Sequence, residues 1–441
     1  MQSTTIAAQA TAPGKGGIAI VRISGPEADP LLASVFCAAG LEGPFESHRM
    51  YYGHVMVHGA PLDEGMAVLM RSPRSYTRED VAEVHLHGGE FVVEQLLQAL
   101  YSLGAQPAQP GEFTRRAFLN GRVDLGRAEA VMQMIAATGE RAARAGLRGL
   151  QGGASAFVRR AQQQLMDILA GVAASLDYPD EIDEQQATLN LLPQTRALAH
   201  SLRAACDQRS ARILESGLEV VICGRPNVGK SSLLNLLLGE ERAIVTEEAG
   251  TTRDIIRGSV LLDGVRINFA DTAGIRQSQQ RVEQIGIRLA EKAMQGADLT
   301  LIVLDQGEPL IQDDLRILEM VRDLPHLVVL NKSDLPPAQG LPQGLLISAQ
   351  TGEGLEALRK AIVAYAEHVG EGALTLERHM RLAARAADAL EEAAAAMEKE
   401  EPLDLCAVHL HDALSVLGEV TGDNVTESLL DQVFSQFCVG K

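Results

Sequence analysis

The stretch GRPNVGKS, which runs from Gly224 to Ser231, has the residue types and spacing of a phosphate-binding loop. It follows the apolar run EVVIC and precedes the helix-like run SLLNLLL, which is the order of strand, loop and helix that such a loop requires. Gly224 and Gly229 allow backbone N–H groups to turn toward anionic oxygens, and Lys230 supplies a positive charge for the β and γ phosphates. The hydroxyl of Ser231 can ligate Mg²⁺. The stretch therefore predicts binding of a nucleoside triphosphate with magnesium.

Three further motifs follow in order and predict that the base is guanine. DTAG begins at Asp271, which would hold the magnesium shell, and ends at Gly274, whose N–H would meet the γ-phosphate. NKSD ends at Asp334, whose carboxylate can accept from both N1–H and the 2-amino group of guanine. Adenine lacks that pair of donors, so its binding would leave polar groups unpaired. SAQ begins at Ser348 and would place a backbone N–H on guanine O6.

The residues around the γ-phosphate differ from those of Ras-like proteins, because Ile275 follows DTAG and the glutamine that orients water is absent. An asparagine inside the phosphate loop together with GTTRD at 250–254 resembles GTPases that are activated by potassium. There K⁺ would supply the charge of an arginine finger. Glu283, in RVEQIGI, is the predicted water-positioning residue. The predicted potassium ligands are Asn227, Thr246, Glu248 and Thr251, and the predicted magnesium ligands are Ser231 and Thr252.

These motifs together predict one GTP site and its catalytic groups. Lys230 and Glu283 are the predicted catalytic residues of GTP hydrolysis. The predicted GTP contacts are Asn227, Val228, Gly229, Lys230, Ser231, Ser232, Thr246, Glu247, Glu248, Ala249, Gly250, Thr251, Thr252, Asp271, Thr272, Ala273, Gly274, Asn331, Lys332, Asp334, Ser348 and Ala349.

The elements that must position these residues change in character along the chain. With 441 residues the chain exceeds one hydrophobic core, so two or three domains are expected. Short β-rich runs before residue 120 predict a mixed α/β domain, and the alternation of strand and helix from 217 to 368 predicts a mainly parallel sheet. The flanking segments have helical spacing, which favours one helical domain with the α/β block inserted, and two separate helical domains remain the alternative. The predicted domains are 1–120, 121–213 with 374–441, and 214–373.

Charge and cysteine content restrict the partners and the compartment. The net charge of −19 opposes tight, independent binding to nucleic acid, so an RNA substrate would need a local basic patch or a basic partner. The five cysteines are widely separated and form no CxxC pair, so neither a disulfide framework nor a zinc site is indicated, and a cytoplasmic location is expected. No apolar run approaches the roughly 18 residues of a membrane span, so no membrane association is expected.

Several segments outside the common GTP motifs resemble one family. They are IAAQATAPGKGGIAIVRISG, PGEFTRRAFLNGRVDLGRAEAV, GTTRD, RVEQIGI and the terminal FCVGK, and together they are similar to the MnmE (TrmE) family of tRNA-modification GTPases over essentially the whole chain. The resemblance implies a folate-binding N-terminal α+β domain, a helical domain interrupted by a Ras-like P-loop GTPase domain, and a homodimer. It also implies an FAD- and NADH-dependent MnmG-type partner in a heterotetramer. The two proteins would add an aminomethyl or carboxymethylaminomethyl group to C5 of the wobble uridine, U34, in certain tRNAs.

The resemblance also places a folate site. The contacts of 5-formyl- or methylene-tetrahydrofolate would fall on Arg22, Glu83, Arg122 and Lys441. The pterin shares the 2-amino-4-oxo edge of guanine, so Glu83 could read it as Asp334 reads guanine, while cationic groups suit the glutamate tail of folate. His85 and His87 lie on one face of a predicted strand, but no third ligand is evident, so we predict structural roles for them rather than a metal site.

The carboxyl-terminal segment SQFCVGK poses a separate question. A prenylation box fits badly because Gly440 is not aliphatic and the last residue is lysine. The segment resembles the CxGK tail of the family, which implies that it folds back toward the folate site and brings Cys438 near the one-carbon unit. A thiol there could act catalytically, as a nucleophile or an acid. The alternative is a small buried residue that docks the tail.

Two other functions compete with this interpretation. A GTP-dependent ribosome-assembly switch of the Era or Der type would share the asparagine in the phosphate loop. The sequence shows no second G domain and no KH-type GxxG module after the first, and its acidic balance is wrong for a protein that binds rRNA alone. A folate-dependent aminomethyltransferase with a vestigial G domain would be excluded by hydrolysis of GTP.

Overall fold

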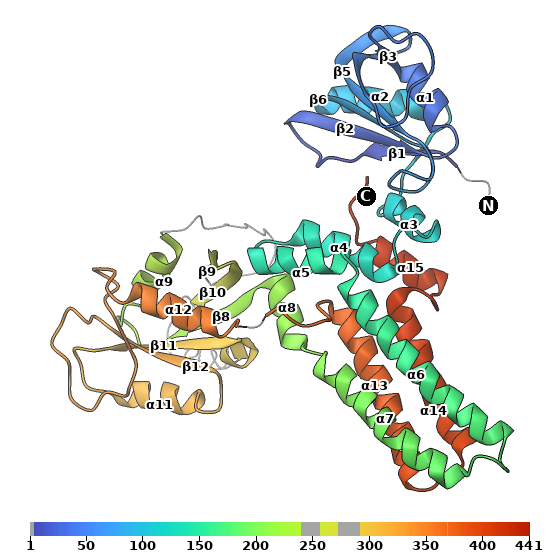
Figure 1. Ribbon diagram of the computed structural model, residues 1–441. Coiled ribbons are helices and arrows are strands. Elements are labelled where there is room, and N and C mark those ends of the chain that lie inside the picture. Colours follow the sequence, from blue (N-terminus) through green and yellow to red (C-terminus); the bar gives the residue numbers. More distant parts are fainter. Residues whose placement is uncertain (1–3, 240–255, 272–291, 368) are drawn as a thin grey trace, which may run out of the picture. The chain divides into compact units, whose positions relative to one another are not determined.

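The computed structural model describes residues 4–239, 256–271, 292–367 and 369–441 (Figure 1). The chain divides into two compact units. Unit 1 comprises Met1–Met132, Leu150–Arg196 and Ala389–Lys441, and unit 2 comprises Gln133–Gly149 and Ala197–Asp388. Within the described residues, no helix is both long enough and apolar enough to span a bilayer. The predicted domain boundaries at 120, 213 and 373 remain predictions.

Unit 1 begins with a seven-stranded sheet in the order β3-β4-β5-β6-β2-β1-β7. All neighbouring strands pair antiparallel except β1 and β7, which are parallel. Helices α1 and α2 cover one face, where alternate strand residues form an apolar core that excludes water. The strands are β1 (Ile6–Gln9), β2 (Gly16–Ser24), β3 (Phe36–Ala38), β4 (Met50–Val57), β5 (Ala60–Met70), β6 (Val81–Gly88) and β7 (Gln106–Pro107), and the helices are α1 (Ala28–Val35) and α2 (Glu90–Ser102).

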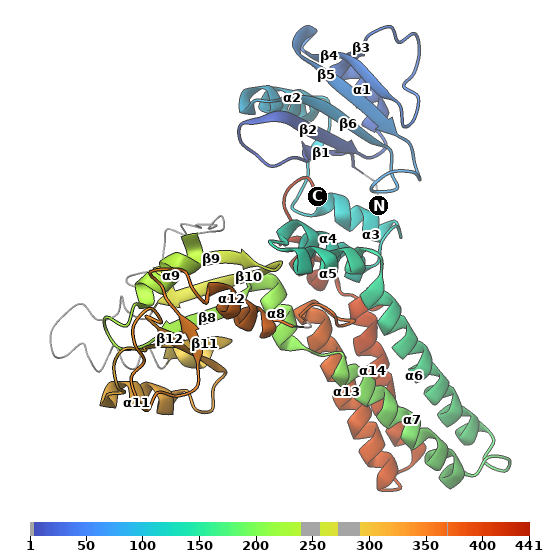
Figure 2. The same ribbon diagram turned by 60° about the vertical axis from the view of Figure 1, so that its left-hand side comes forward.

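The helical part of unit 1 is built on long helices with small buried residues. Helices α6 and α14 lie side by side in both views (Figures 1 and 2). The predicted helical run after residue 126 is divided into several helices, since the turn at 137–139 ends one and Gly152, with φ 86°, precedes another. The helices of unit 1 are α3 (Glu112–Leu119), α6 (Gly153–Asp177), α14 (Leu403–Thr421) and α15 (Glu427–Phe434). Helix α5 (Glu140–Leu150) belongs to unit 2, apart from its last residue, and α4 (Leu125–Ala136), α7 (Glu184–Ala204) and α13 (Glu377–Glu398) each have residues in both units.

Unit 2 contains the predicted mainly parallel sheet, in the order β13-β12-β11-β8-β10-β9. Only the edge strand β9 runs antiparallel to its neighbour. Apolar residues of α9 and α12 pack on one face and those of α11 on the other, which explains why the central strands β8 and β11 are mostly apolar. The elements are α8 (Gln208–Ser216), β8 (Leu218–Cys223), α9 (Lys230–Gly239), β9 (Ile256–Leu262), β10 (Val265–Asp271), β11 (Leu299–Asp305), α11 (Gln312–Met320), β12 (His326–Asn331), β13 (Leu345–Ile347) and α12 (Leu355–Ala364).

Candidate functional site

The phosphate loop joins the end of β8 to the start of α9, as its sequence predicts. Gly224, Asn227 and Gly229 have φ values of 152°, 66° and 95°, which favour glycine or asparagine. An added Cβ would lie 2.4 Å from the carbonyl oxygen of Val303 at Gly224, and 2.2 Å from Nδ2 of Asn331 at Gly229. The two glycines are therefore required by backbone conformation and by close approach.

Lys230 lies inside this loop. Its side chain is buried, with 7% exposure, and Nζ donates to the carbonyl oxygen of Arg225 at 2.7 Å. Ser231 and Ser232 follow as exposed residues in the first turn of α9, while Val228 is buried. A buried ammonium beside a helix N-terminus forms an electropositive cradle that suits a phosphate chain.

The base-recognition motifs meet the phosphate loop through Asn331. Its side chain is 2% exposed, donates from Nδ2 to the carbonyl oxygen of Val228 at 2.7 Å, and accepts at Oδ1 from the N–H of Ala349 at 3.0 Å. The hydroxyl of Ser348 donates to Oδ1 of Asp334 at 2.6 Å. The structure thus brings NKSD and SAQ together beside the phosphate loop, and the exposed Asp334 is oriented by a second motif.

Asp305 belongs to this site and was missed by sequence reasoning. It ends β11, its side chain is 4% exposed, and Oδ2 lies 2.5 Å from Nζ of Lys332. Lys332 has φ 67°, and the ion pair with Asp305 fixes the end of its side chain. The sequence does show an aspartate at the end of the apolar strand LTLIVLD, which could have indicated a site residue. Its partner is 27 residues away in the chain, so the ion pair cannot be read from the local sequence.

Part of the predicted GTP site cannot be placed. Asp271 ends β10. The residues that lie outside the described part of the chain are Thr246, Glu247, Glu248, Ala249, Gly250, Thr251, Thr252, Thr272, Ala273, Gly274 and Glu283. The described residues fit GTP, because they provide a glycine-lined cradle, a buried lysine and an exposed carboxylate for guanine.

A second site lies in unit 1, where the carboxyl-terminal tail is docked. Phe434 and Phe437 are buried in an apolar cluster. The N–H of Phe113 donates to a main-chain carboxylate oxygen of Lys441 at 3.2 Å. Gly440 has φ 96°, and an added Cβ there would lie 2.1 Å from the carbonyl oxygen of Gln9. The tail is thus fixed against the end of β1 and the start of α3.

Cys438 takes no part in burying the tail. Its thiol is exposed, and its carbonyl oxygen accepts from the N–H of Gly111 at 3.4 Å. The alternative that Cys438 docks the tail as a small buried residue is therefore wrong, because the two phenylalanines and Gly440 provide that contact.

Arg22 connects the docked tail to the sheet. It is paired in register with Glu83 on the neighbouring strand, with Nε 2.8 Å from Oε1, and Nη1 donates to the carbonyl oxygen of Gly440 at 3.3 Å. Its guanidinium carbon lies 5.1 Å from the ring centre of Tyr76 and 5.6 Å from that of Phe113. The arginine is thereby oriented by charge, by the tail and by two aromatic rings.

Arg122 joins the same cluster through Tyr76. Its guanidinium carbon lies 4.6 Å from the ring centre of Tyr76, and Nη1 donates to the carbonyl oxygen of that residue at 3.0 Å. Three of the four residues expected to contact folate are therefore close together. Lys441 reaches the cluster through the contact of its backbone with Phe113. Sequence reasoning missed Tyr76 and Phe113, because an isolated aromatic residue gives no signal of its neighbours.

Glu83 is held in the ionised form. A hydrogen bond with His85 and the charge of Arg22 lower the pKa of Glu83, although burial opposes them. Nε2 of His85 lies 3.5 Å from Oε2 of Glu83, so this contact is long and weak, and the buried nitrogen has no well-formed hydrogen bond. His87 is 68% exposed, with Nδ1 2.8 Å from Oδ1 of Asp63, which raises the pKa of His87. Among the described residues, no group of three potential ligands could hold a metal ion.

Comparison with protein families gives matches on both units. Residues 5–122 match the model described as the GTP-binding protein TrmE N-terminus. Residues 125–438 match the model described as the MnmE helical domain.

Individual proteins are similar over the same extent. The tRNA modification GTPase MnmE of Listeria innocua is 42% identical over 460 residues, which cover 100% of both chains. That of Parasynechococcus marenigrum is 45% identical over 451 residues, which cover 100% of this chain and 99% of the relative. A crystal structure of Aquifex aeolicus Era bound to GDP.AlF4⁻ is 33% identical and covers 33% of this chain and 56% of that chain, with a TM-score of 0.28. The similarity to the two relatives therefore extends well beyond the GTP motifs.

Proposed function

Because the chain belongs to the MnmE family of tRNA modification GTPases, we propose that it joins GTP hydrolysis to a folate-dependent modification of the wobble uridine in tRNA. The chain is a GTP hydrolase. With an MnmG-type FAD protein, it would install the 5-aminomethyl or 5-carboxymethylaminomethyl group on U34 of certain tRNAs. The one-carbon unit would come from 5-formyl- or methylene-tetrahydrofolate. The single observation that carries this proposal is the docked tail beside Arg22 and Glu83.

In the GTP site, Lys230 would hold the β and γ phosphates and Asp334 would read guanine. Ser231 and Thr252 would hold Mg²⁺, which neutralises charge on the phosphates when it is bound. Potassium would be held by Asn227, Thr246, Glu248 and Thr251, and Glu283 would position water. Support for the potassium site comes from Asn227, since its exposed side chain stands at a left-handed position of the loop.

The Arg22 cluster would bind the folate. Glu83 is ionised, so it can accept from the N–H and 2-amino groups of a pterin. Arg122 and Lys441 are exposed or half-exposed cations that would suit the carboxylates of the glutamate tail. Cys438 is exposed on the docked tail, which supports a chemical role for its thiol next to the one-carbon unit.

A homodimer is supported by the sheet face opposite α1 and α2. On this face, Tyr52 of β4 lies opposite Met66 of β5, which lies opposite His85 of β6. The side chain of Tyr52 is 56% exposed and that of Met66 is 42% exposed. Ile18, on β2, is 65% exposed. The same face carries Arg22 and Glu83, so a second copy of the chain would cover apolar side chains beside the folate cluster. The FAD partner and tRNA would complete the assembly.

The test is nucleoside mass spectrometry of bulk tRNA from cells that lack this gene, complemented with wild type or with Cys438→Ser. We expect wild type to restore the C5-modified wobble uridine and the serine variant to fail while still hydrolysing GTP. If both proteins restore the modification, Cys438 has no chemical role. If wild type restores nothing, the tRNA function itself is wrong and a ribosome-assembly switch becomes the better account.

A further inference from the structure

The β9–β10 hairpin of unit 2 has its turn at one end and Asp271 at the other. Asp263 and Gly264 form the turn, and their φ values of 45° and 76° are those of a two-residue type I′ turn. β10 pairs with β9 along its whole length, but it pairs with β8 only from Ile267 onward. The turn end of the hairpin therefore lies beyond the pairing with β8, and its position depends on what else contacts it.

The start of α5 packs directly against this turn. The N–H of Arg141 donates to the carbonyl oxygen of Gly264 at 3.3 Å. An added Cβ at Gly139 would lie 2.4 Å from that same oxygen, and one at Gly264 would lie 2.9 Å from Cβ of Glu140. Glycine at both positions is what allows the two backbones to approach so closely.

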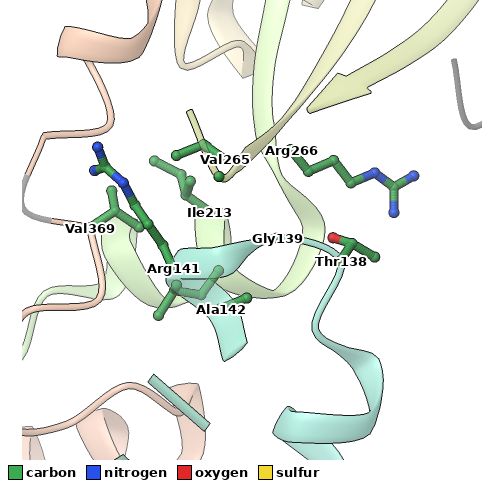
Figure 3. Close-up of a pocket in the computed structure, with 10 residues that line it drawn as sticks. Thr138, Gly139, Arg141, Ala142, Ile213, Val265, Arg266 and Val369 are labelled. Carbon is green, nitrogen blue, oxygen red and sulfur yellow. The ribbon is translucent and has the colours of Figure 1, made fainter. Parts of the chain in front are cut away.

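The side chain of Arg141 makes a second connection. Nη1 donates to the carbonyl oxygen of Ala366, just beyond the end of α12. Figure 3 shows the side chain extending beside Val369, where it borders a cavity of about 10 Å³ that Gly139 and Val265 also line. This space holds one water at most. Arg141 thus connects the hairpin turn, through its backbone N–H, to the segment after α12, through its side chain.

We propose that Arg141 is a positioning residue for GTP hydrolysis. It fixes the turn of the hairpin, and the paired strand β10 carries that position about 20 Å to Asp271. Because β10 is hydrogen-bonded to β9 along its whole length and to β8 from Ile267 onward, a shift at the turn is passed along the hairpin and displaces Asp271 relative to the phosphate loop. The inference rests on the proposed role of Asp271 at the magnesium ion.

The experiment compares GTP hydrolysis by the full chain as wild type, Arg141→Ala, Arg141→Lys and Gly139→Ala. We expect Arg141→Ala and Gly139→Ala to lower kcat about tenfold, because small misplacements of catalytic groups are costly, while affinity for a fluorescent GDP stays within about twofold. Arg141→Lys should recover part of kcat, since it keeps a donor for the carbonyl of Ala366.

Two matched controls lie in the same unit. Arg144→Ala removes an equal charge from the same helix, where Arg144 pairs with Glu140, and should leave kcat unchanged. Gly296→Ala adds a methyl group where nothing lies within 4 Å, and should also leave kcat unchanged.

Three results would overturn the inference. Arg141→Ala could have the kcat of wild type, or Arg144→Ala could lose as much kcat as Arg141→Ala. The third is that Arg141→Ala loses GDP affinity and melting temperature along with kcat, which would indicate general destabilisation. Full hydrolysis by Asp271→Ala would remove the premise. Absence of hydrolysis in the wild-type protein would instead refute the proposed function.

Discussion

Nε of Arg22 lies 2.8 Å from Oε1 of Glu83 across the neighbouring strands β2 and β6. The same guanidinium contacts the carbonyl oxygen of Gly440 at 3.3 Å, 418 residues away in the chain. A carboxylate, an arginine and the carboxyl-terminal tail therefore form one cluster in unit 1. The stability and the binding properties of this cluster can be tested separately.

Glu83 gives a prediction about pH. Its pKa in the fold lies below the ordinary value of 4.5, because of the hydrogen bond with His85 and the charge of Arg22. Its ionised form therefore stabilises the fold above pH 4.5, and this contribution is lost as pH falls through the folded-state pKa. We expect Glu83→Gln to lower the free energy of unfolding by about 1–3 kcal/mol at pH 7 and by less in acid.

Calorimetric unfolding of the full chain at neutral and acid pH measures this difference. Glu42→Gln, at an exposed position of the same unit, is the control and should change little at either pH. The assignment fails if the effect of Glu83→Gln is the same at both pH values.

Asn331 gives a prediction about nucleotide affinity. Replacing it with alanine removes the contacts to Val228 and Ala349, and it leaves the buried carbonyl of Val228 and the half-buried N–H of Ala349 without these partners. We expect Asn331→Ala to weaken binding of a fluorescent GDP by about tenfold or more. Asn235→Ala, at an exposed position of α9, should bind as wild type does. Equal weakening in both variants would contradict the role of Asn331 as the link between the motifs.

Asn227 gives a prediction about cations. If its exposed side chain ligates K⁺, GTP hydrolysis should be about tenfold or more faster in K⁺ than in Na⁺ at equal ionic strength. Asn227→Ala should remove that difference and keep guanine recognition, which depends on Asp334. The measurement is the steady-state rate in each salt. Equal rates for wild type in K⁺ and Na⁺ would remove the potassium site.

Gly440 gives a prediction about the tail. An added Cβ would lie 2.1 Å from the carbonyl oxygen of Gln9, and φ 96° is unfavourable for alanine. We expect Gly440→Ala to undock residues 438–441, which hydrogen exchange by mass spectrometry would detect as lost protection. Gly17→Ala, where an added Cβ meets nothing within 4 Å, is the control. Unchanged protection of the tail in Gly440→Ala would show that this contact does not fix it.

The strand, loop and helix around GRPNVGKS and the strand before NKSD could be predicted from the sequence, because each motif is local. GRPNVGKS contains its own glycines and lysine, and NKSD follows directly on its strand. The role of Asp305 could not be predicted, because its partner Lys332 directly follows the neighbouring strand β12. The cluster around Arg22 requires the register of β2 with β6 and the path of the tail, which depend on packing of the whole unit. Only the resemblance to a family placed Arg22, Glu83 and Arg122 together beforehand.

If the cluster of Arg22 and Glu83 binds a folate, the affinity of the protein for that folate should depend on the carboxylate of Glu83. The measurement is isothermal titration of the full chain with 5-formyltetrahydrofolate, for wild type, Glu83→Gln and the control Glu42→Gln. We expect wild type and the control to bind alike and Glu83→Gln to bind about tenfold or more weakly, because the amide offers a donor to a pterin edge that needs an acceptor. Equal binding by all three proteins, or no binding by wild type, would contradict this expectation.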